Sequence, residues 1–401
     1  MRHFTLAMTM TLLLVSESQA LNYSAWVACI GVPSSYCPLD AGTYPNVLGL
    51  QVANNVTIEG MGASPYSTVL VRTGNTPQAS MIYVPANNTV TIKKLTIDGN
   101  RYSFPNQAGC KFGACGPSGG VGCTVDNWGD NNIRVDGSAT IDGVYFWNSA
   151  DASLYLKAGT LKNSGIYYAR STGAFMESGT AQWTSFDHNG TAGINLLTTG
   201  MKTVKNNVFS QNRYEISDGV SGGQVYVNYY AQNSFIYDNT INGYNWKTAT
   251  GLINGCYPPP TTQAPVGIEV EPYSSNTKIH SNAIVRNPWN GIEAHSVYGL
   301  EISGYLKDIC GSCYPRYIEN NSGLSISGIG NGISAPQATG FPFSSGLTLD
   351  RVLSRNNYGL AASIPQGTSG PGWQGNHCLQ SSYSTSTVLS QPYPASTTTC
   401  P

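Results

Sequence analysis

Short apolar segments recur along the chain, each with two apolar residues separated by one residue of any type. In a β-strand alternate side chains face opposite ways, so each segment predicts a short strand with two side chains pointing inward. A glycine often comes directly before the pair. The segments are Leu154–Leu156, Ile194–Leu196, Val225–Val227, Ile268–Val270, Ile292–Ala294 and Leu324–Ile326, with Phe175 and Leu360 aligned more loosely.

The spacing of these segments indicates a solenoid. Neighbouring segments are 21 residues apart from Leu154 to Phe175, 19 from there to Ile194, and 24 from Ile268 to Ile292. Periods of this size are typical of coils that stack one on another. We attribute the longer intervals to inserted loops, at 213–222, 246–265 and 305–321.

Two further strands are expected in each coil. A second strand ends in an asparagine, and a short third apolar segment follows it. Asparagine suits such a corner because it tolerates left-handed backbone and its amide can bond to the equivalent side chain of the next coil. Examples of the second strand are Val204–Asn207, Ile236–Asn239 and Ile279–Asn282, and examples of the third are Val208–Phe209, Ile241 and Ile284–Val285.

These repeats, together with Leu39–Tyr44, Val56–Gly60 and Leu95–Asn100, resemble the pectate-lyase-like superfamily. The resemblance covers roughly Leu39 to Ser363. It implies an all-β fold, namely a single-stranded right-handed parallel β-helix with a disulfide-stapled cap and loops. One such fold hosts many functions, so the resemblance is specific for the fold and not for the activity.

The two ends of the chain differ from the repeats. Residues 1–20 begin with basic residues, continue with an apolar run and end in a small-x-small pattern, which predicts a cleaved signal peptide. We therefore expect a secreted or extracellular protein, with the periplasm or cell surface as alternatives. We assign residues 21–380 to the β-helix domain and the Ser/Thr/Pro-rich residues 381–401 to a C-terminal tail.

All ten cysteines follow the predicted signal peptide, and an even number in an exported protein favours disulfides. Cys29 is close enough to Cys37 to staple the N-terminal cap, and Cys378 could pair with Cys400. The others form two trios, which are Cys110, Cys115 and Cys123, and Cys256, Cys310 and Cys313.

The low charge of the chain argues against some classes of binding partner. Charged residues make up 10% of the sequence and the net charge is −1. Nucleic acids and anionic membranes bind basic surfaces, so we expect neither as a partner. No later stretch approaches the ~20 apolar residues that span a bilayer, so no membrane insertion is expected. An extracellular polysaccharide is the expected partner and a monomer the expected state.

The strands around residue 270 carry the most informative side chains. If Ile268 and Val270 point inward, then Glu269 and Glu271 point outward. In the next coil the same alternation turns Glu293 and His295 outward, and in the preceding coil Tyr226 and Asn228. Stacked coils would place these six residues on one outer wall. Solvated strands often carry single polar residues, but the chain has only nine glutamates and three lie here.

This cluster admits more than one chemistry. Carboxylates with an amide oxygen match what Ca²⁺ prefers, so Asn228, Glu269 and Glu271 are candidate metal ligands. Paired carboxylates also suit glycoside hydrolysis. The candidates for proton transfer are Arg213, Lys278, Glu293 and His295, and the candidates for contact with sugars are Tyr226, Tyr273 and Trp289.

The resemblance to the superfamily favours a lyase. One branch of its lyases binds Ca²⁺ through an Asn and a Glu-x-Glu pair on adjacent coils, which Asn228, Glu269 and Glu271 are similar to. This implies Ca²⁺-assisted β-elimination of an acidic, uronate-containing polysaccharide. The Asn-Thr-Asp, Asp-Asp and Gly-His-Gly motifs of the polygalacturonase-like branch are absent from the sequence. A glycoside hydrolase and a non-catalytic surface or adhesion protein remain as alternatives.

Overall fold

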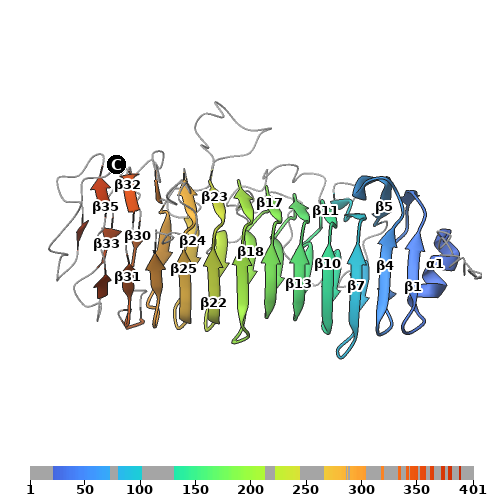
Figure 1. Ribbon diagram of the computed structural model, residues 1–401, viewed down its shortest axis with the longest axis horizontal. Coiled ribbons are helices and arrows are strands. Elements are labelled where there is room, and N and C mark those ends of the chain that lie inside the picture. Colours follow the sequence, from blue (N-terminus) through green and yellow to red (C-terminus); the bar gives the residue numbers. More distant parts are fainter. Residues whose placement is uncertain are drawn as a thin grey trace, which may run out of the picture.

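In the computed structural model the chain forms an elongated stack of coils, with the N-terminal helix at one end (Figure 1). The residues that the structure describes are 21–72, 80–101, 131–212, 222–243, 266–285, 287 and 290–303, followed by short segments between 318 and 389. The predicted signal peptide lies outside these residues. Each coil contributes one strand to each of three sheets, called A, B and C, and the paired strands of the described residues are parallel.

Each sheet contains twelve strands in chain order. Sheet A consists of β1 (Tyr36–Leu39), β4 (Val56–Gly60), β7 (Thr89–Lys93), β10 (Ser138–Asp142), β13 (Gly159–Lys162), β16 (Gly179–Gln182), β19 (Lys202–Lys205), β22 (Gln232–Tyr237), β25 (Ser275–His280), β28 (Glu301–Ser303), β31 (Thr348–Asp350) and β34 (Gly372–Gln374).

Sheet B follows sheet A across a tight corner. It consists of β2 (Gly42–Tyr44), β5 (Thr68–Val71), β8 (Thr96–Asp98), β11 (Tyr145–Trp147), β14 (Gly165–Tyr167), β17 (Ser185–Asp187), β20 (Val208–Ser210), β23 (Thr240–Asn242), β26 (Ala283–Val285), β29 (Ile318–Glu319), β32 (Leu353–Asn357) and β35 (Cys378–Ser381).

Sheet C completes each coil and later carries the candidate site. It consists of β3 (Leu50–Gln51), β6 (Ile82–Val84), β9 (Ile133–Val135), β12 (Leu154–Leu156), β15 (Thr172–Met176), β18 (Ala192–Leu196), β21 (Gly223–Val227), β24 (Val266–Val270), β27 (Ile292–Ala294), β30 (Ile333–Ser334), β33 (Ala362–Ser363) and β36 (Val388–Leu389).

Aliphatic side chains form continuous stacks inside the solenoid. On sheet A, for example, Ile92, Ile141 and Leu161 are register partners and are fully buried. A buried aliphatic side chain contributes about 1.5–3 kcal/mol relative to exposure, and stacking it between two coils removes it from water on both sides. The predicted solenoid of three-sided coils is confirmed.

The predicted inward pairs are confirmed for five segments, because Leu154, Ile194, Val225, Ile268 and Ile292 are all fully buried in sheet C. The glycine before such a pair has no space for a side chain. A Cβ on Gly267 would lie 2.4 Å from the carbonyl oxygen of Gly291 in the next coil.

Two alignments were wrong. Phe175 lies in the outward register beside Tyr155, and the inward pair of its coil is Ala174 and Met176. Hydrophobicity alone does not distinguish a phenylalanine that points outward from one in the core. Ile292 pairs with Ile333, so β30 occupies the place predicted for Leu324–Ile326, which lies outside the described residues.

The asparagine corners between sheets A and B are confirmed. Asn207, Asn239 and Asn282 are buried and stacked on successive coils. The backbone N–H and the side-chain amide of Asn207 both donate to Asn239 Oδ1, at 2.9 and 3.1 Å. Asn239 donates to Asn282 Oδ1 in the same way, at 3.0 and 2.9 Å. This ladder satisfies buried polar groups that the tight corner would otherwise leave without partners.

The N-terminal end is closed by helix α1 (Tyr23–Ile30), which the sequence analysis did not predict. Asn22 caps it by accepting the backbone N–H of Ala25 at 3.0 Å, and Trp26 and Ile30 are buried against the first coils. The predicted Cys29–Cys37 disulfide is present. No helix in the described part of the chain combines the length and apolarity needed to cross a membrane.

At the other end, sheet C continues to β36, so the stacked strands extend past residue 380, the predicted domain boundary, to Leu389. The predicted Cys378–Cys400 pair includes a residue outside the described ones. The two cysteine trios and the three inserted loops also lie outside the described residues, apart from Gly222 and the two residues of β29.

Candidate functional site

The outer wall predicted around residue 270 exists on sheet C. Glu269 on β24 is the register partner of Tyr226 on β21 and of Glu293 on β27. The residues that directly follow these strands continue the same stacking, since the N–H of Glu271 donates to Val227 O at 2.9 Å and that of His295 to Val270 O at 2.8 Å. We call Tyr226, Glu269, Glu271, Glu293 and His295 the acidic cluster.

Glu271 is held by tyrosine hydroxyls. Its side chain is buried, and its Oε1 accepts the hydroxyl of Tyr226 at 3.0 Å. Burial, together with the charges of Glu271 and Glu269, raises the pKa of Tyr226, so this hydroxyl stays a donor. Tyr229 also donates to Glu271, and burial and this carboxylate raise the pKa of Tyr229. Glu271 is therefore fixed in position inside the wall.

His295 lies between the other two carboxylates. Its Nε2 is 3.2 Å from Glu293 Oε1 and 3.9 Å from Glu269 Oε1. Burial acts to lower the pKa of His295, but the hydrogen bond to Glu293 and the charges of the three glutamates outweigh it and raise the pKa. The Asn290 amide donates to Glu293 Oε2 at 2.8 Å, so both oxygens of Glu293 are bound.

One predicted catalytic residue, Lys278, does not join this cluster in the structure. Lys278 lies on β25 in sheet A, where its Nζ forms an ion pair with Glu301 Oε2 at 3.1 Å. Lys278 therefore lies on a different wall of the solenoid from the acidic cluster, because sheets A and C are separate faces of each coil. Arg213 and the sugar-binding candidate Trp289 lie outside the described residues.

The aromatic candidates differ in what they offer to a ligand. Tyr226 is only 4% exposed, so it supports Glu271 and offers little surface to a sugar. Tyr273 stacks between Tyr230 and Tyr298, with ring centroids 5.1 and 6.1 Å away, so both of its faces are covered. Tyr230 is 61% exposed and is the first ring of this stack in chain order.

The expected Ca²⁺ ligands are engaged with other partners. Asn228 Oδ1 accepts the backbone N–H of Tyr229 at 2.7 Å, and Glu271 Oε1 accepts the Tyr226 hydroxyl. Among the described residues, no three His, Cys, Asp or Glu side chains are grouped so as to hold a metal ion. A calcium site needs several oxygens turned toward one point, so Ca²⁺ binding by Asn228, Glu269 and Glu271 stays a prediction.

The sequence analysis missed the role of two residues. It assigned no role to Tyr229 or to Asn290. Both lie in turns, where side-chain direction does not follow strand alternation. The only sequence signal for Asn290 is its place just before Gly291 and the inward pair of β27.

Residues 131–306 match the family model described as "Right handed beta helix region". This agrees with the strand order and register of the three sheets, and with the fold that the pectate-lyase-like resemblance implied. No curated protein matches the sequence significantly.

Solved structures of similar architecture share little sequence with the chain. The mannuronan C-5 epimerase AlgE4 A-module of Azotobacter vinelandii is 12% identical over 94% of this chain and 95% of that one, with a TM-score of 0.34. The catalytic unit of a GH87 α-1,3-glucanase from Streptomyces thermodiastaticus is 14% identical over 90% and 66%, with a TM-score of 0.46. The surface adhesin PfbA of Streptococcus pneumoniae is 11% identical over 70% and 84%, with a TM-score of 0.37. We draw no functional conclusion from likenesses this distant.

Proposed function

The protein is a right-handed parallel β-helix protein, and on that premise we propose that it is a glycoside hydrolase with Glu269 and Glu293 as its carboxyl pair. The observation that carries this proposal is their position side by side on β24 and β27, on an outer wall, with one imidazole beside both. A pair of carboxyl groups is what most glycosidases use to cleave an acetal bond.

The surroundings of the two carboxyl groups suggest different roles. Glu293 accepts the Asn290 amide and pairs with His295, and these two donors hold its carboxyl group in place, so we assign it as the nucleophile. Glu269 is 4% exposed and lies beside Glu293 on the neighbouring strand, so it is the second member of the carboxyl pair. We therefore assign Glu269 as the general acid.

The strand spacing favours a retaining reaction. Adjacent strands are about 4.8 Å apart, which is near the ~5 Å between the carboxyl groups of retaining enzymes. Glu269 would give its proton to the glycosidic oxygen while Glu293 attacks the anomeric carbon. The protonated glycosidic oxygen leaves with the other part of the polysaccharide chain. Glu269, now ionised, would then take a proton from water while the water oxygen attacks the anomeric carbon and breaks its bond to Glu293. The sugar is released with its anomeric configuration retained.

A neutral polysaccharide fits this wall better than a uronate polymer. The acidic cluster has three carboxyl groups and one imidazole, and within its described surroundings no Lys or Arg faces it. A uronate carboxylate would be repelled there unless a cation or protons intervened. We also keep, as part of the proposal, an extracellular setting reached through the segment 1–20.

Release of reducing ends from a panel of soluble neutral polysaccharides tests the proposal. Replacing Glu293 with Gln should lower the rate about 100- to 10,000-fold, because the side chain keeps its size and loses its charge. Glu301→Gln is the matched control, since Glu301 lies on β28 in sheet A, paired with Lys278 and His280. Equal rates for the wild type and Glu293→Gln would refute the assignment.

The Ca²⁺-assisted elimination expected from the sequence gives a different result in the same assay. It would act on polygalacturonate or alginate, generate an unsaturated product that absorbs ultraviolet light, and stop when Ca²⁺ is chelated. Hydrolysis by the carboxyl pair produces no such absorbance and persists with a chelator. A protein that binds a polysaccharide and never cleaves it would instead support the adhesion alternative.

A further inference from the structure

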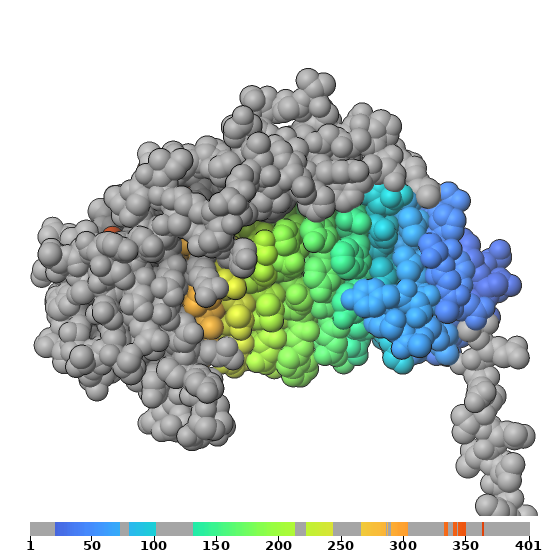
Figure 2. All heavy atoms as spheres, turned by 90° about the horizontal axis from the view of Figure 1, so that it is seen from above, coloured from blue at the N-terminus to red at the C-terminus, as the bar shows by residue number. Residues whose placement is uncertain are grey.

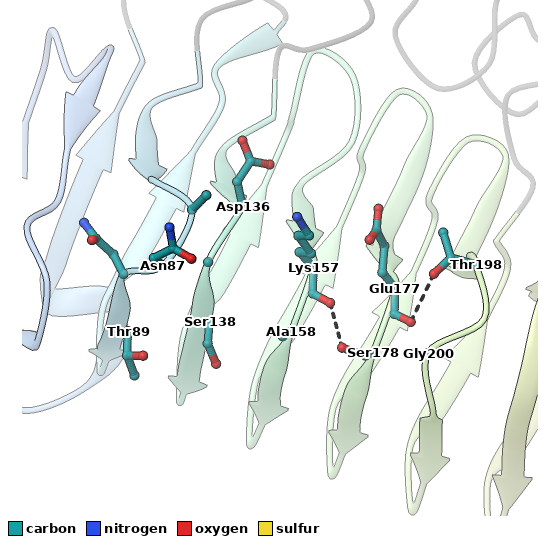
Figure 3. Close-up of a pocket in the computed structure, with 13 residues that line it drawn as sticks. Asn87, Thr89, Asp136, Ser138, Lys157, Ala158, Glu177, Ser178, Thr198 and Gly200 are labelled. Atoms are coloured by element: carbon teal, nitrogen blue, oxygen red, sulfur yellow. Dashed lines mark hydrogen bonds between the residues drawn. The ribbon is translucent and has the colours of Figure 1, made fainter.

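A polar hollow of about 470 Å³ lies at the corner where sheet C turns into sheet A, nearer the N-terminus than the acidic cluster. Five successive coils line it. Figure 3 shows their side chains along one side of the coils. The polar residues among them are Asn87, Asn88, Thr89, Asp136, Ser138, Lys157, Glu177, Ser178 and Thr198.

Charged side chains alternate along one side of this hollow. Asp136, Lys157 and Glu177 follow β9, β12 and β15 and point the same way from consecutive coils (Figure 3). Asp136 accepts the Tyr83 hydroxyl at 3.1 Å and forms an ion pair with Arg134 at 3.1 Å, and Glu177 accepts the hydroxyl of Tyr155. Lys157 is exposed and has no ion pair or hydrogen bond through its ammonium group within the described part of the chain.

The backbone of the hollow is held in place by side chains. Ser178 Oγ donates to Lys157 O at 2.8 Å. At the end nearer the acidic cluster, the buried Lys202 donates its Nζ protons to Leu197 O and Thr198 O, at 2.9 and 2.6 Å. A surface whose turns are fixed in this way needs little ordering when a ligand binds, which lowers the entropic cost of binding.

The hollow and the acidic cluster lie on one line. Main-chain hydrogen bonds connect the position after each strand of sheet C, from Asp136 through Lys157, Glu177, Leu197, Asn228 and Glu271 to His295. Lys157 and Glu271 are four strand spacings apart, or about 19 Å at ~4.8 Å per coil. Figure 2 shows the coils as adjacent bands along the long axis, so nearby coils form a continuous surface.

We propose that the hollow is a distal subsite that holds the same neutral polysaccharide chain whose bond is cleaved at the acidic cluster. This rests on the proposed function and adds to it a substrate of extended length, bound along the solenoid axis. The hydroxyls, amides and ammonium group of the hollow can exchange hydrogen bonds with sugar hydroxyls. The charges of Arg134, Asp136, Lys157 and Glu177 cancel, so the hollow suits a neutral polymer.

Paired substitutions test this subsite. Lys157→Ala removes the ammonium group, and Asn87→Gly removes an amide at a position with a φ of 68°, which glycine adopts without strain. The matched control combines Lys205→Ala with Asn206→Gly, at the opposite end of the sheet A strands, and Asn206 also has a positive φ of 55°. Decasaccharides and tetrasaccharides of the cleaved polysaccharide serve as substrates.

The Lys157/Asn87 double variant should raise KM for the decasaccharide about tenfold, through the loss of two hydrogen bonds, and reduce the preference for long chains over short ones. A similar KM change in the Lys205/Asn206 control, or a long-chain preference that survives the Lys157/Asn87 substitutions, would overturn the proposal while leaving hydrolysis intact.

Direct binding separates this proposal from the proposed function. If no polysaccharide is cleaved, calorimetry with soluble α-glucan, β-glucan and mannan still tests the hollow. Binding that weakens about tenfold in the Lys157/Asn87 variant and not in its control supports the subsite even though the hydrolase assignment fails. Binding that is equal in all three proteins, or absent, overturns the subsite.

Discussion

Tyr226 determines how Glu271 is held on the outer wall of sheet C. Its ring is buried in line with Glu269, and its hydroxyl reaches diagonally to Glu271. A carboxylate inside the wall is tolerated only when donors satisfy it, because an unpaired buried charge costs several kcal/mol. His295 is the corresponding partner of Glu293, since its Nε2 lies 3.2 Å from Glu293 Oε1. Glu271 thus depends on Tyr226 from the preceding coil, whereas Glu293 depends on Asn290 and His295 from its own coil.

We expect Tyr226→Phe to reduce the free energy of unfolding by about 1–3 kcal/mol, because it removes a donor from the buried Glu271 and leaves the ring in place. Urea unfolding measures this effect. Tyr230→Phe is the control, since Tyr230 is 61% exposed, and it should change stability by much less. Equal effects of the two substitutions would show that the Tyr226 hydroxyl does not support Glu271.

His295 gives the cluster a pH dependence. Its pKa in the folded protein is raised above 6.5, so its protonated form stabilises the fold. That contribution is fully present below pH 6.5 and is lost as the pH rises through the raised pKa. An NMR titration of the imidazole should show the raised value in the wild type and a lower one in Glu293→Gln. An unchanged pKa in that variant would mean that Glu293 is not its main partner.

At the scale of the element, each strand of the solenoid depends on its corners as much as on its own residues. Strands such as β20 and β26 have three residues, too few to persist alone. The Asn207–Asn239–Asn282 ladder joins the corners of three coils, and Asn239 also donates to Val204 O at 2.9 Å. The ladder holds the strands of sheets A and B in one register, and so it fixes the coils that carry sheet C.

Asn239→Ala should therefore reduce the free energy of unfolding by about 2–3 kcal/mol, because it leaves buried amide groups of Asn207 and Asn282 without their shared partner. Chemical denaturation is the measurement. Asn206→Gly changes a neighbouring exposed asparagine whose positive φ glycine accommodates, so its effect should be small. If the ladder does not stabilise the fold, Asn239→Ala and Asn206→Gly would change the free energy of unfolding by similar amounts.

At the scale of the whole molecule, the fold is nearly one-dimensional. Each coil contacts mainly the coil before it and the coil after it, so the effect of a local defect decays along the axis. Helix α1 covers the first coil, while the acidic cluster lies many coils away (Figure 1). The cap and the site can therefore be perturbed separately.

Trp26→Ala tests this separation. Its side chain is fully buried in the cap, and its loss should destabilise the cap by about 3–5 kcal/mol. Hydrogen exchange should then become faster in the first two coils and stay slow around β21, β24 and β27. Ile194→Ala, in the middle of the stack, should instead accelerate exchange in the coils next to the cluster. Uniform acceleration by Trp26→Ala would show that the solenoid unfolds as one unit.

The sequence by itself determined the coil, because alternation within a strand and repetition between coils are local patterns. It was sufficient to stack Glu269 on Glu293 and to place the asparagine corners. It did not determine the register of Phe175, where two apolar orientations are equally compatible with the pattern.

Only the tertiary structure decided which polar groups meet. The diagonal bond from Tyr226 to Glu271, the bond from Asn290 to Glu293 and the pairing of Lys278 with Glu301 depend on side-chain directions across strands and in turns. The hollow beside Lys157 depends on five turns whose residues are far apart in sequence. The physical reason is that strand periodicity fixes the face on which a residue lies, whereas its partner depends on the neighbouring coil and on the conformation of the turn.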